Sequence, residues 1–286
     1  MDRRLLLSLL SLGAAQALVA CAGGDATPTP ATSRSGPDGR RKGGPGEAAP
    51  AGLSRTAPPP SPPPLPPIPP IPPPHPGPPH VVFGAPHRTN QIALTIDDGY
   101  SPETVAGYVA FAQRSRIPIT FSPNGAYREI WDRHVAVLRP LVAAGQVQIG
   151  NHTWTHKNIV GRSDAAIRDD VERNEEWIQK TFGITSRPWF RPPYGSHNRH
   201  VDGVVGDLGY TKVLLWNGSF GDSTPITPQQ LMGLATQYLR PGTIMLGHAN
   251  HQTVLGLFDQ IEKLIEQRRL APVTLDTMFG TSRAVG

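Results

Sequence analysis

Two short motifs contain residues that could hold and use a metal ion. The first, TIDDG at residues 95–99, places two aspartates side by side. The second, HTWTH at residues 152–156, places two histidines four positions apart. One aspartate and two histidines form a three-ligand set that leaves a coordination position open, as in a catalytic zinc site. The other aspartate is then available as a base, so the two motifs indicate metal-assisted hydrolysis.

Each of these residues has an ordinary structural interpretation when it is considered alone. An Asp-Asp pair after a strand commonly forms a turn or caps a helix. What favours chemistry is that the polar residues share one kind of position. Asp97, Asp98, His152, Arg191 and His248 each fall just after a predicted strand. In a β/α barrel those strand ends meet on the face where active sites are built.

The elements that must position these residues are strands and helices in alternation. Apolar runs predict strands at residues 91–96, 117–121, 147–149, 189–190, 210–216, 243–246 and 273–275. Helical periodicity and capping residues predict helices at residues 101–115, 127–144, 163–182, 227–240 and 254–269. This order indicates an α/β fold with a parallel sheet and crossover helices, either open or closed into a barrel.

The first twenty residues resemble the signal peptide of a bacterial lipoprotein. A positively charged start precedes an apolar stretch at residues 5–17 that is too short for a comfortable membrane span. LVAC at residues 18–21 resembles a lipobox, in which the cysteine is acylated. We therefore expect a signal peptide at residues 1–20 and a lipid anchor at Cys21, on the extracytoplasmic face of a bacterial cell membrane. An ordinary secretory signal is the alternative.

A proline-rich linker is predicted to follow at residues 21–80. Residues 22–79 contain 21 of the 33 prolines and lack the apolar side chains needed for a core. The densest part, residues 58–79, favours polyproline II at about 3.1 Å per residue, which makes a stiff spacer. A single folded catalytic domain is then expected at residues 81–286.

The charge distribution argues against nucleic acid as a partner. The chain carries a net charge of +5, of which +3 lies in residues 1–80. The folded part therefore has only a small positive charge, with no basic stripe interleaved with aromatic residues. Cys21 is the one cysteine, which excludes an intramolecular disulfide.

With RPPYG at residues 191–195 and LGH at 246–248, the motifs stand in the order found in a known family. Over roughly residues 90–280 the chain resembles the polysaccharide deacetylases, the NodB-homology domain of carbohydrate esterase family 4. The resemblance implies a distorted (β/α)7 barrel. It also implies removal of acetyl groups from N-acetylglucosamine polymers or from xylan.

The resemblance further implies roles for individual residues. Asp98, His152 and His156 would hold the metal, by default Zn²⁺, with Co²⁺ or Ni²⁺ as alternatives. Asp97 would be the general base, and Arg191 would pair with it and orient it.

The remaining implied roles concern the leaving group, the oxyanion and the acetyl group. His248 would be the general acid, with Asp222 as the carboxylate that raises its pKa. The backbone N–H of Tyr194 would help to stabilise the oxyanion. Leu246 would contribute to the pocket for the acetyl methyl group.

Two positions at the substrate groove are predicted to contact the polymer, and two others depart from the family pattern. Trp216 and Pro193 are the expected groove residues. Ser223 stands where the family usually has a tryptophan. His248 is followed by Ala249-Asn250, where an acidic residue is usual. These departures leave the identity of the substrate open.

The function predicted from the sequence is removal of N-acetyl groups from an N-acetylglucosamine-containing polysaccharide, by a monomeric enzyme. Peptidoglycan and a chitin-like polymer are both candidates. The alternatives are an O-acetyl esterase acting on xylan, a non-catalytic wall-binding protein on the same fold, and an amide hydrolase for a small molecule.

Overall fold

The computed structural model describes residues 70–281. The predicted signal peptide, the predicted lipidation site Cys21 and the predicted linker up to residue 69 lie outside this range. Among residues 70–281, no helix is both long enough and apolar enough to cross a membrane.

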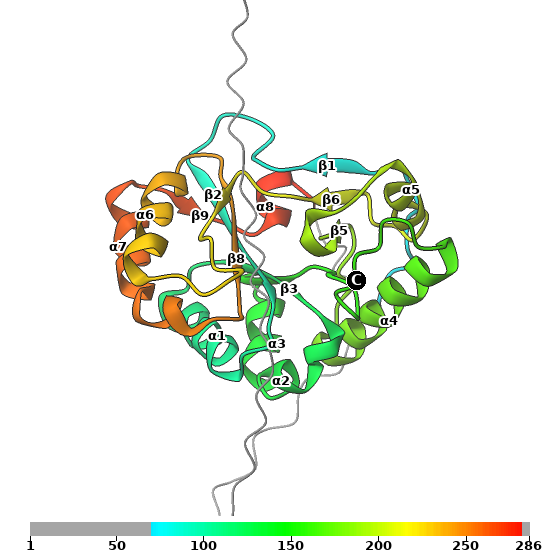
Figure 1. Ribbon diagram of the computed structural model, residues 1–286, viewed down its shortest axis with the longest axis horizontal. Coiled ribbons are helices and arrows are strands. Elements are labelled where there is room, and N and C mark those ends of the chain that lie inside the picture. Colours follow the sequence, from blue (N-terminus) through cyan, green and yellow to red (C-terminus); the bar gives the residue numbers. More distant parts are fainter. Residues whose placement is uncertain (1–69, 282–286) are drawn as a thin grey trace, which may run out of the picture. The chain divides into compact units, whose positions relative to one another are not determined.

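Two groups of parallel strands form the centre of the domain (Figure 1). The larger sheet has the order β4-β3-β2-β8-β7, and β9 pairs with the start of β2. The smaller sheet has the order β1-β6-β5. A single parallel bridge between Asn151 and Phe190 joins the end of β4 to β5. The strand bounds are β1 His80–Val82, β2 Gln91–Asp98, β3 Ile119–Pro123, β4 Val147–Ile149, β5 Trp189–Phe190, β6 Lys212–Leu214, β7 Gly218–Ser219, β8 Ile244–His248 and β9 Ala271–Pro272.

Helices surround the strands, with α6 and α7 on one side of the view and α4 and α5 on the other (Figure 1). An α/β fold with parallel strand pairing is therefore confirmed. The α-helices are α1 Pro102–Ser115, α2 Arg128–Asp132, α3 Val135–Ala143, α4 Asp164–Phe182, α5 Arg199–Asp207, α6 Pro228–Tyr238, α7 Phe258–Gln267 and α8 Leu275–Phe279. Short 3₁₀ turns lie at Gly125–Tyr127, Pro193–Gly195 and Gln252–Gly256.

Three of the predicted helices begin where their capping residues indicate. The hydroxyls of Ser101 and Ser163 accept the backbone N–H groups that open α1 and α4. Thr227 and Gln230 form the predicted capping box of α6. Gly183 ends α4 in the left-handed conformation. The local sequence therefore determines where these helices begin.

The long helix predicted at residues 127–144 is wrong in one respect, because it is divided at Arg133 and His134. The first part, α2, is held by Trp131, which is fully buried and donates its indole N–H to the backbone carbonyl of Asp98. The second part, α3, buries Leu138 instead. One straight helix does not bury both Trp131 and Leu138 at these positions, so the chain turns between α2 and α3.

Other differences between the predicted and observed elements occur where the sequence pattern is short or weak. The strand predicted at residues 273–275 is wrong: Thr274 caps α8, and the strand β9 comes earlier. The strand predicted at 210–216 is shorter and is followed by the separate strand β7. Helix α5 was not predicted, because Gly203 and Gly206 lower its helix propensity.

Residues 70–79 have no regular secondary structure, and their last part lies against α5. The backbone N–H of Gly77 donates to the carbonyl of Gly206. A Cβ at position 206 would come within 2.7 Å of the Gly77 carbonyl oxygen. Glycine at 206 therefore allows this close approach of two backbones.

Candidate active site

The polar ends of β2 and β8 lie side by side because the two strands pair in parallel. The register places Asp97 opposite His248. Asp98 ends β2, and His152 lies shortly after β4. These strand ends open into a pocket of about 470 Å³, whose lining includes Asp97, Asp98, His152, His156, Tyr194, Trp216, Leu246 and His248. The prediction that the polar strand ends share one face is confirmed.

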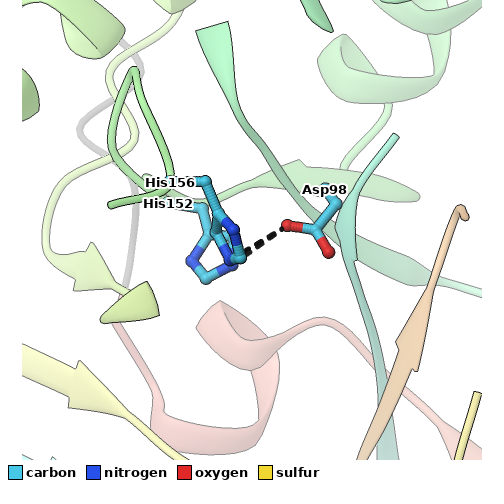
Figure 2. Close-up of side chains that lie close together, drawn as sticks. All are labelled: Asp98, His152 and His156. Carbon is cyan, nitrogen blue, oxygen red and sulfur yellow. Dashed lines mark ion pairs between the residues drawn. The ribbon is translucent and has the colours of Figure 1, made fainter. Parts of the chain in front are cut away.

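Asp98, His152 and His156, which all line this pocket, lie close together and face one another (Figure 2). The Oδ1 atom of Asp98 lies 3.4 Å from Nε2 of His152 and 3.3 Å from Nε2 of His156. Within residues 70–281 these three form the one group of His, Cys, Asp or Glu side chains with the spacing of a metal site. They constitute a divalent metal site.

The hydrogen bonds around the three residues fit a bound cation. Nδ1 of His152 lies 2.7 Å from the carbonyl oxygen of Arg191, so Nδ1 carries the proton and Nε2 presents its lone pair to the site. The buried Oδ1 of Asp98 has no hydrogen-bond partner among the described residues. A cation between these atoms would satisfy both.

The charges around Asp98 and His156 agree with this arrangement. Burial alone would raise the pKa of the Asp98 carboxyl, but His152 and His156 hold it well below its ordinary value. Burial and the neighbouring His152 lower the pKa of His156. The pKa of His152 is raised, since Asp97 and Asp98 outweigh its burial. An ionised Asp98 and a neutral His156 are the forms in which these side chains bind metals.

Asp97 faces the same pocket but has a different partner. Nη1 of Arg191 donates to Oδ2 of Asp97 at 3.1 Å, and Nη2 of Arg191 donates to the hydroxyl of Thr95 at 3.0 Å. Arg191 is only 1% exposed, and burial lowers its pKa despite the adjacent carboxylate. The Oδ1 atom of Asp97 has no hydrogen-bond partner in the described part of the chain. One oxygen of Asp97 is thus fixed and the other is available.

His248 is hydrogen-bonded to Asp222, whose side chain is buried. Nδ1 of His248 lies 2.9 Å from Oδ1 of Asp222, and the backbone N–H of His248 donates to Oδ2 at 3.1 Å. Burial alone would lower the pKa of His248, but the hydrogen bond and charge of Asp222 raise it above its ordinary value. The ring is therefore both oriented and biased toward its protonated form.

Comparison with known proteins agrees with this site. Residues 84–213 match the family model described as polysaccharide deacetylase. This chain carries a polysaccharide deacetylase domain of carbohydrate esterase family 4. Polysaccharide deacetylases are hydrolases, so this domain is a hydrolase domain.

The relatives of the deacetylase domain are distant. A peptidoglycan-N-acetylglucosamine deacetylase from Bacillus cereus is 24% identical over 205 residues, covering 70% of this chain and 72% of the relative. A chitin deacetylase from Pestalotiopsis sp is 29% identical, covering 68% of this chain and 65% of the relative. The chain spans 41% of the length of the related Listeria monocytogenes enzyme.

Solved structures show the same fold. A family 4 carbohydrate esterase from Streptomyces lividans in complex with acetate has a TM-score of 0.58 at 22% identity, covering 70% of this chain and 99% of that chain. A CE4 family pseudoenzyme from Bacillus anthracis has a TM-score of 0.62 at 20% identity, covering 70% of this chain and 69% of that chain. The fold is therefore shared by enzymes and by a pseudoenzyme.

Most, but not all, of the predicted groove residues line the pocket. Leu246 and Trp216 line the pocket, and the Trp216 ring also packs against the Arg191 guanidinium at 5.4 Å. Tyr194 is 68% exposed and has a positive φ of 60°. The prediction that Pro193 contacts the polymer is wrong. Pro193 is buried in the turn, and its neighbour Pro192 lines the pocket instead.

Sequence reasoning missed several residues of the pocket wall. Tyr100, which is 42% exposed, lies edge-on to Tyr127, and its hydroxyl is 3.1 Å from Nε2 of His251. Asn250 is also part of the lining. Ser223 lines the pocket at the position where the family pattern has a tryptophan. The available signal was sequence proximity, since Tyr100 directly follows the motif at residues 95–99 and Asn250 lies two positions after the motif at 246–248.

Proposed function

We propose that the protein removes N-acetyl groups from an N-acetylglucosamine-containing polysaccharide, either peptidoglycan or a chitin-like polymer. The observation that carries the proposal is one pocket that combines the Asp98–His152–His156 metal site with Asp97 and His248. A pseudoenzyme has the same fold, so the activity rests on these side chains and not on the architecture. Zn²⁺ is the proposed metal, with Co²⁺ and Ni²⁺ as alternatives.

A divalent cation held by the three ligands would polarise the acetyl carbonyl and make a water molecule more acidic. Asp97 is the general base: Arg191 fixes its Oδ2, and its Oδ1 accepts the proton of the attacking water. Water adds to the carbonyl carbon, and the negative charge that develops on the carbonyl oxygen is stabilised by the backbone N–H of Tyr194.

The amine leaves when it receives a proton. His248, protonated and held by Asp222, is the general acid that donates to the nitrogen as the C–N bond breaks. The products are acetate and a free amino sugar. Leu246, 5% exposed and part of the lining, contributes the apolar wall for the acetyl methyl group.

The rim of the pocket supports a sugar as the substrate. Tyr100, Tyr127, Tyr194 and Trp216 all line it. Such side chains combine an apolar face with a polar edge, which suits the alternating C–H and hydroxyl surfaces of a sugar ring. The similarity to a peptidoglycan-N-acetylglucosamine deacetylase and to a chitin deacetylase also supports this substrate class.

We further propose that the enzyme acts as a monomer tethered near its substrate. The lipobox-like LVAC ending at Cys21 supports a lipid anchor on the extracytoplasmic face of a bacterial membrane, and the proline-rich stretch supports a spacer. This placement favours peptidoglycan over a soluble polymer. The parallel strands and the Asn151–Phe190 bridge support a distorted (β/α)7 barrel.

Acetate release by the zinc-loaded full chain tests the function. The substrates are an N-acetylglucosamine oligomer, peptidoglycan and acetylxylan, and the matched control is Asp97→Asn, which keeps the shape of the side chain. We expect acetate from the amino sugars, falling by about 10²–10⁴-fold in the variant. Acetate from xylan alone would establish an O-acetyl esterase. No acetate from any substrate would reject a polysaccharide deacetylase activity.

A further inference from the structure

We propose that Asn250 is a positioning residue for the metal ligand Asp98. Its amide nitrogen donates to Oδ2 of Asp98 at 2.7 Å. Asn250 is 7% exposed and comes from the loop after β8, whereas Asp98 ends β2. The inference rests on the metal site of the proposed function.

The orientation of the Asn250 amide is determined by its neighbours. Its oxygen accepts the backbone N–H groups of Gly99 at 3.2 Å and Tyr100 at 3.4 Å. Two donors on one side require the oxygen there, so the NH₂ group must face the carboxylate. A flipped amide would place its oxygen against Oδ2 of Asp98 and leave three groups without partners.

This contact determines which oxygen of Asp98 faces the metal site. With Oδ2 bound to Asn250, Oδ1 is directed toward Nε2 of His152 and His156. Because an amide is neutral, Asn250 orients the carboxylate without adding positive charge beside the cation. A lysine or arginine in the same place would orient Asp98 but repel the metal.

The backbone around Asp98 needs this support. Asp98 has a φ of 67° and Gly99 a φ of 112°. A non-glycine residue in the left-handed region is strained and persists only where its surroundings fix it. Trp131 holds the carbonyl of Asp98 at 2.9 Å. Asn250 holds the side chain of Asp98 and the next two backbone N–H groups.

The loop that carries Asn250 is itself fixed to β2. The backbone N–H of Ala249 donates to the carbonyl of Asp97 at 2.9 Å, and the N–H of Ser101 donates to the carbonyl of Ala249 at 3.3 Å. The pairing of the two strands therefore continues past their ends. These backbone hydrogen bonds hold Asn250 beside Asp98, so the position of Asn250 does not depend on side-chain packing alone.

The test is the Zn²⁺ dissociation constant of the full chain, measured by competition with a chromophoric chelator at fixed pH. Asn250→Asp keeps an oxygen for Gly99 and Tyr100 but removes the donor to Asp98. Asn250→Ala removes the whole group at a position that water can reach. For Asn250→Ala we expect Zn²⁺ binding about 10–100-fold weaker, the usual cost of losing an outer-shell partner of a ligand. In Asn250→Asp the added negative charge attracts the cation and offsets part of this loss, so we expect a smaller weakening.

The matched control is Asn217→Asp. The Asn217 side-chain oxygen also accepts a backbone N–H, from Ile244 at 2.9 Å, but at the opposite end of β8. We expect its Zn²⁺ affinity to equal that of the unmodified protein. Thermal unfolding of the metal-free proteins separates positioning from general stability, because a purely structural role would lower the melting temperature and leave the affinity unchanged.

Three outcomes have distinct meanings. Weaker Zn²⁺ binding in the Asn250 variants, with Asn217→Asp unaffected, supports the proposal. Unchanged affinity in Asn250→Ala overturns it, whether or not stability falls. Asp98→Ala tests the underlying site: if this variant binds Zn²⁺ as tightly as the unmodified protein, the metal site is wrong, and with it the proposed function.

Discussion

Asp97 and Asp98 are adjacent and chemically identical, yet the structure gives them different environments. Asp97 continues the strand and meets Arg191. Asp98 leaves the strand with a positive φ and meets two histidines and Asn250. A free base and a metal ligand can therefore come from neighbouring residues, since the backbone turns one carboxylate away from the other.

The pairing of His248 with Asp222 predicts a specific pH dependence. Asp222 raises the pKa of His248, so the proton needed for the general acid is retained to higher pH. Activity should fall as pH rises through that raised pKa. In Asp222→Asn the histidine loses its proton sooner, so the alkaline limb of the kcat profile should move to lower pH. The measurement is kcat against pH for both proteins.

Asp132→Asn is the control for this experiment, since Asp132 accepts a hydrogen bond from the Trp177 indole away from the pocket. Its alkaline limb should match that of the unmodified enzyme. If Asp222→Asn also left the limb unchanged, His248 would not be the group that controls it.

At the scale of elements, the loop at residues 152–156 depends on α4. Asp170 of α4, which is 3% exposed, accepts the backbone N–H of Thr155 at 2.8 Å and its hydroxyl at 2.7 Å. Thr153 and His156 in this loop have positive φ angles of 65° and 54°. The helix therefore holds the histidine loop in a conformation that its residues do not favour alone.

Asp170→Ala should lower the free energy of unfolding by about 1–3 kcal/mol, because the Thr155 N–H is left without its partner. The measurement is urea denaturation. The neighbouring Asp169 is exposed, so Asp169→Ala should stay within about 0.5 kcal/mol of the unmodified protein. Equal effects of the two substitutions would show that α4 does not anchor the loop through this carboxylate.

At this scale, the sequence predicted the features that depend on residues a few positions apart and missed those that depend on distant contacts. Ser101, Ser163 and Thr227 act on residues three positions away, so α1, α4 and α6 were predicted with their starts. The break between α2 and α3 depends on Trp131 reaching Asp98, 33 positions earlier. No local pattern contains that contact.

The same distinction holds within the site. The shared face of the strand ends followed from the alternation of elements. The two motifs and the family resemblance identified the metal ligands, which the structure brings together. The contact between Asp98 and Asn250 joins residues 152 positions apart. Asparagine is common in loops, and the bond to Asp98 exists only once β8 lies beside β2. A single sequence does not contain that information.

At the scale of the whole molecule, the segment before β1 is part of the folded surface. Gly206→Ala would place a Cβ 2.7 Å from the carbonyl oxygen of Gly77 and 3.0 Å from Cδ of Pro79. We expect this substitution to destabilise the domain or to free the segment for proteolysis. Urea denaturation and limited digestion of the full chain measure the two effects.

Gly203→Ala is a control in the same helix, since a Cβ there meets nothing within 4 Å. It should stabilise the protein by about 0.5–1 kcal/mol through helix propensity alone. If Gly206→Ala stabilised the protein equally, the close approach of residues 77–79 to α5 would contribute nothing to the fold.

The parallel pairing of β2 with β8 has a consequence for the order of biosynthesis. A ribosome releases the metal ligands, Asp97 and Arg191 well before it releases residues 244–250. Until then β2 has an unpaired edge at the centre of the sheet, and both the proposed proton donor His248 and Asn250 are missing. A nascent chain that stalls before β8 would therefore be an inactive, aggregation-prone intermediate, so that catalytic competence and protection of the central strand arrive in the same step of synthesis.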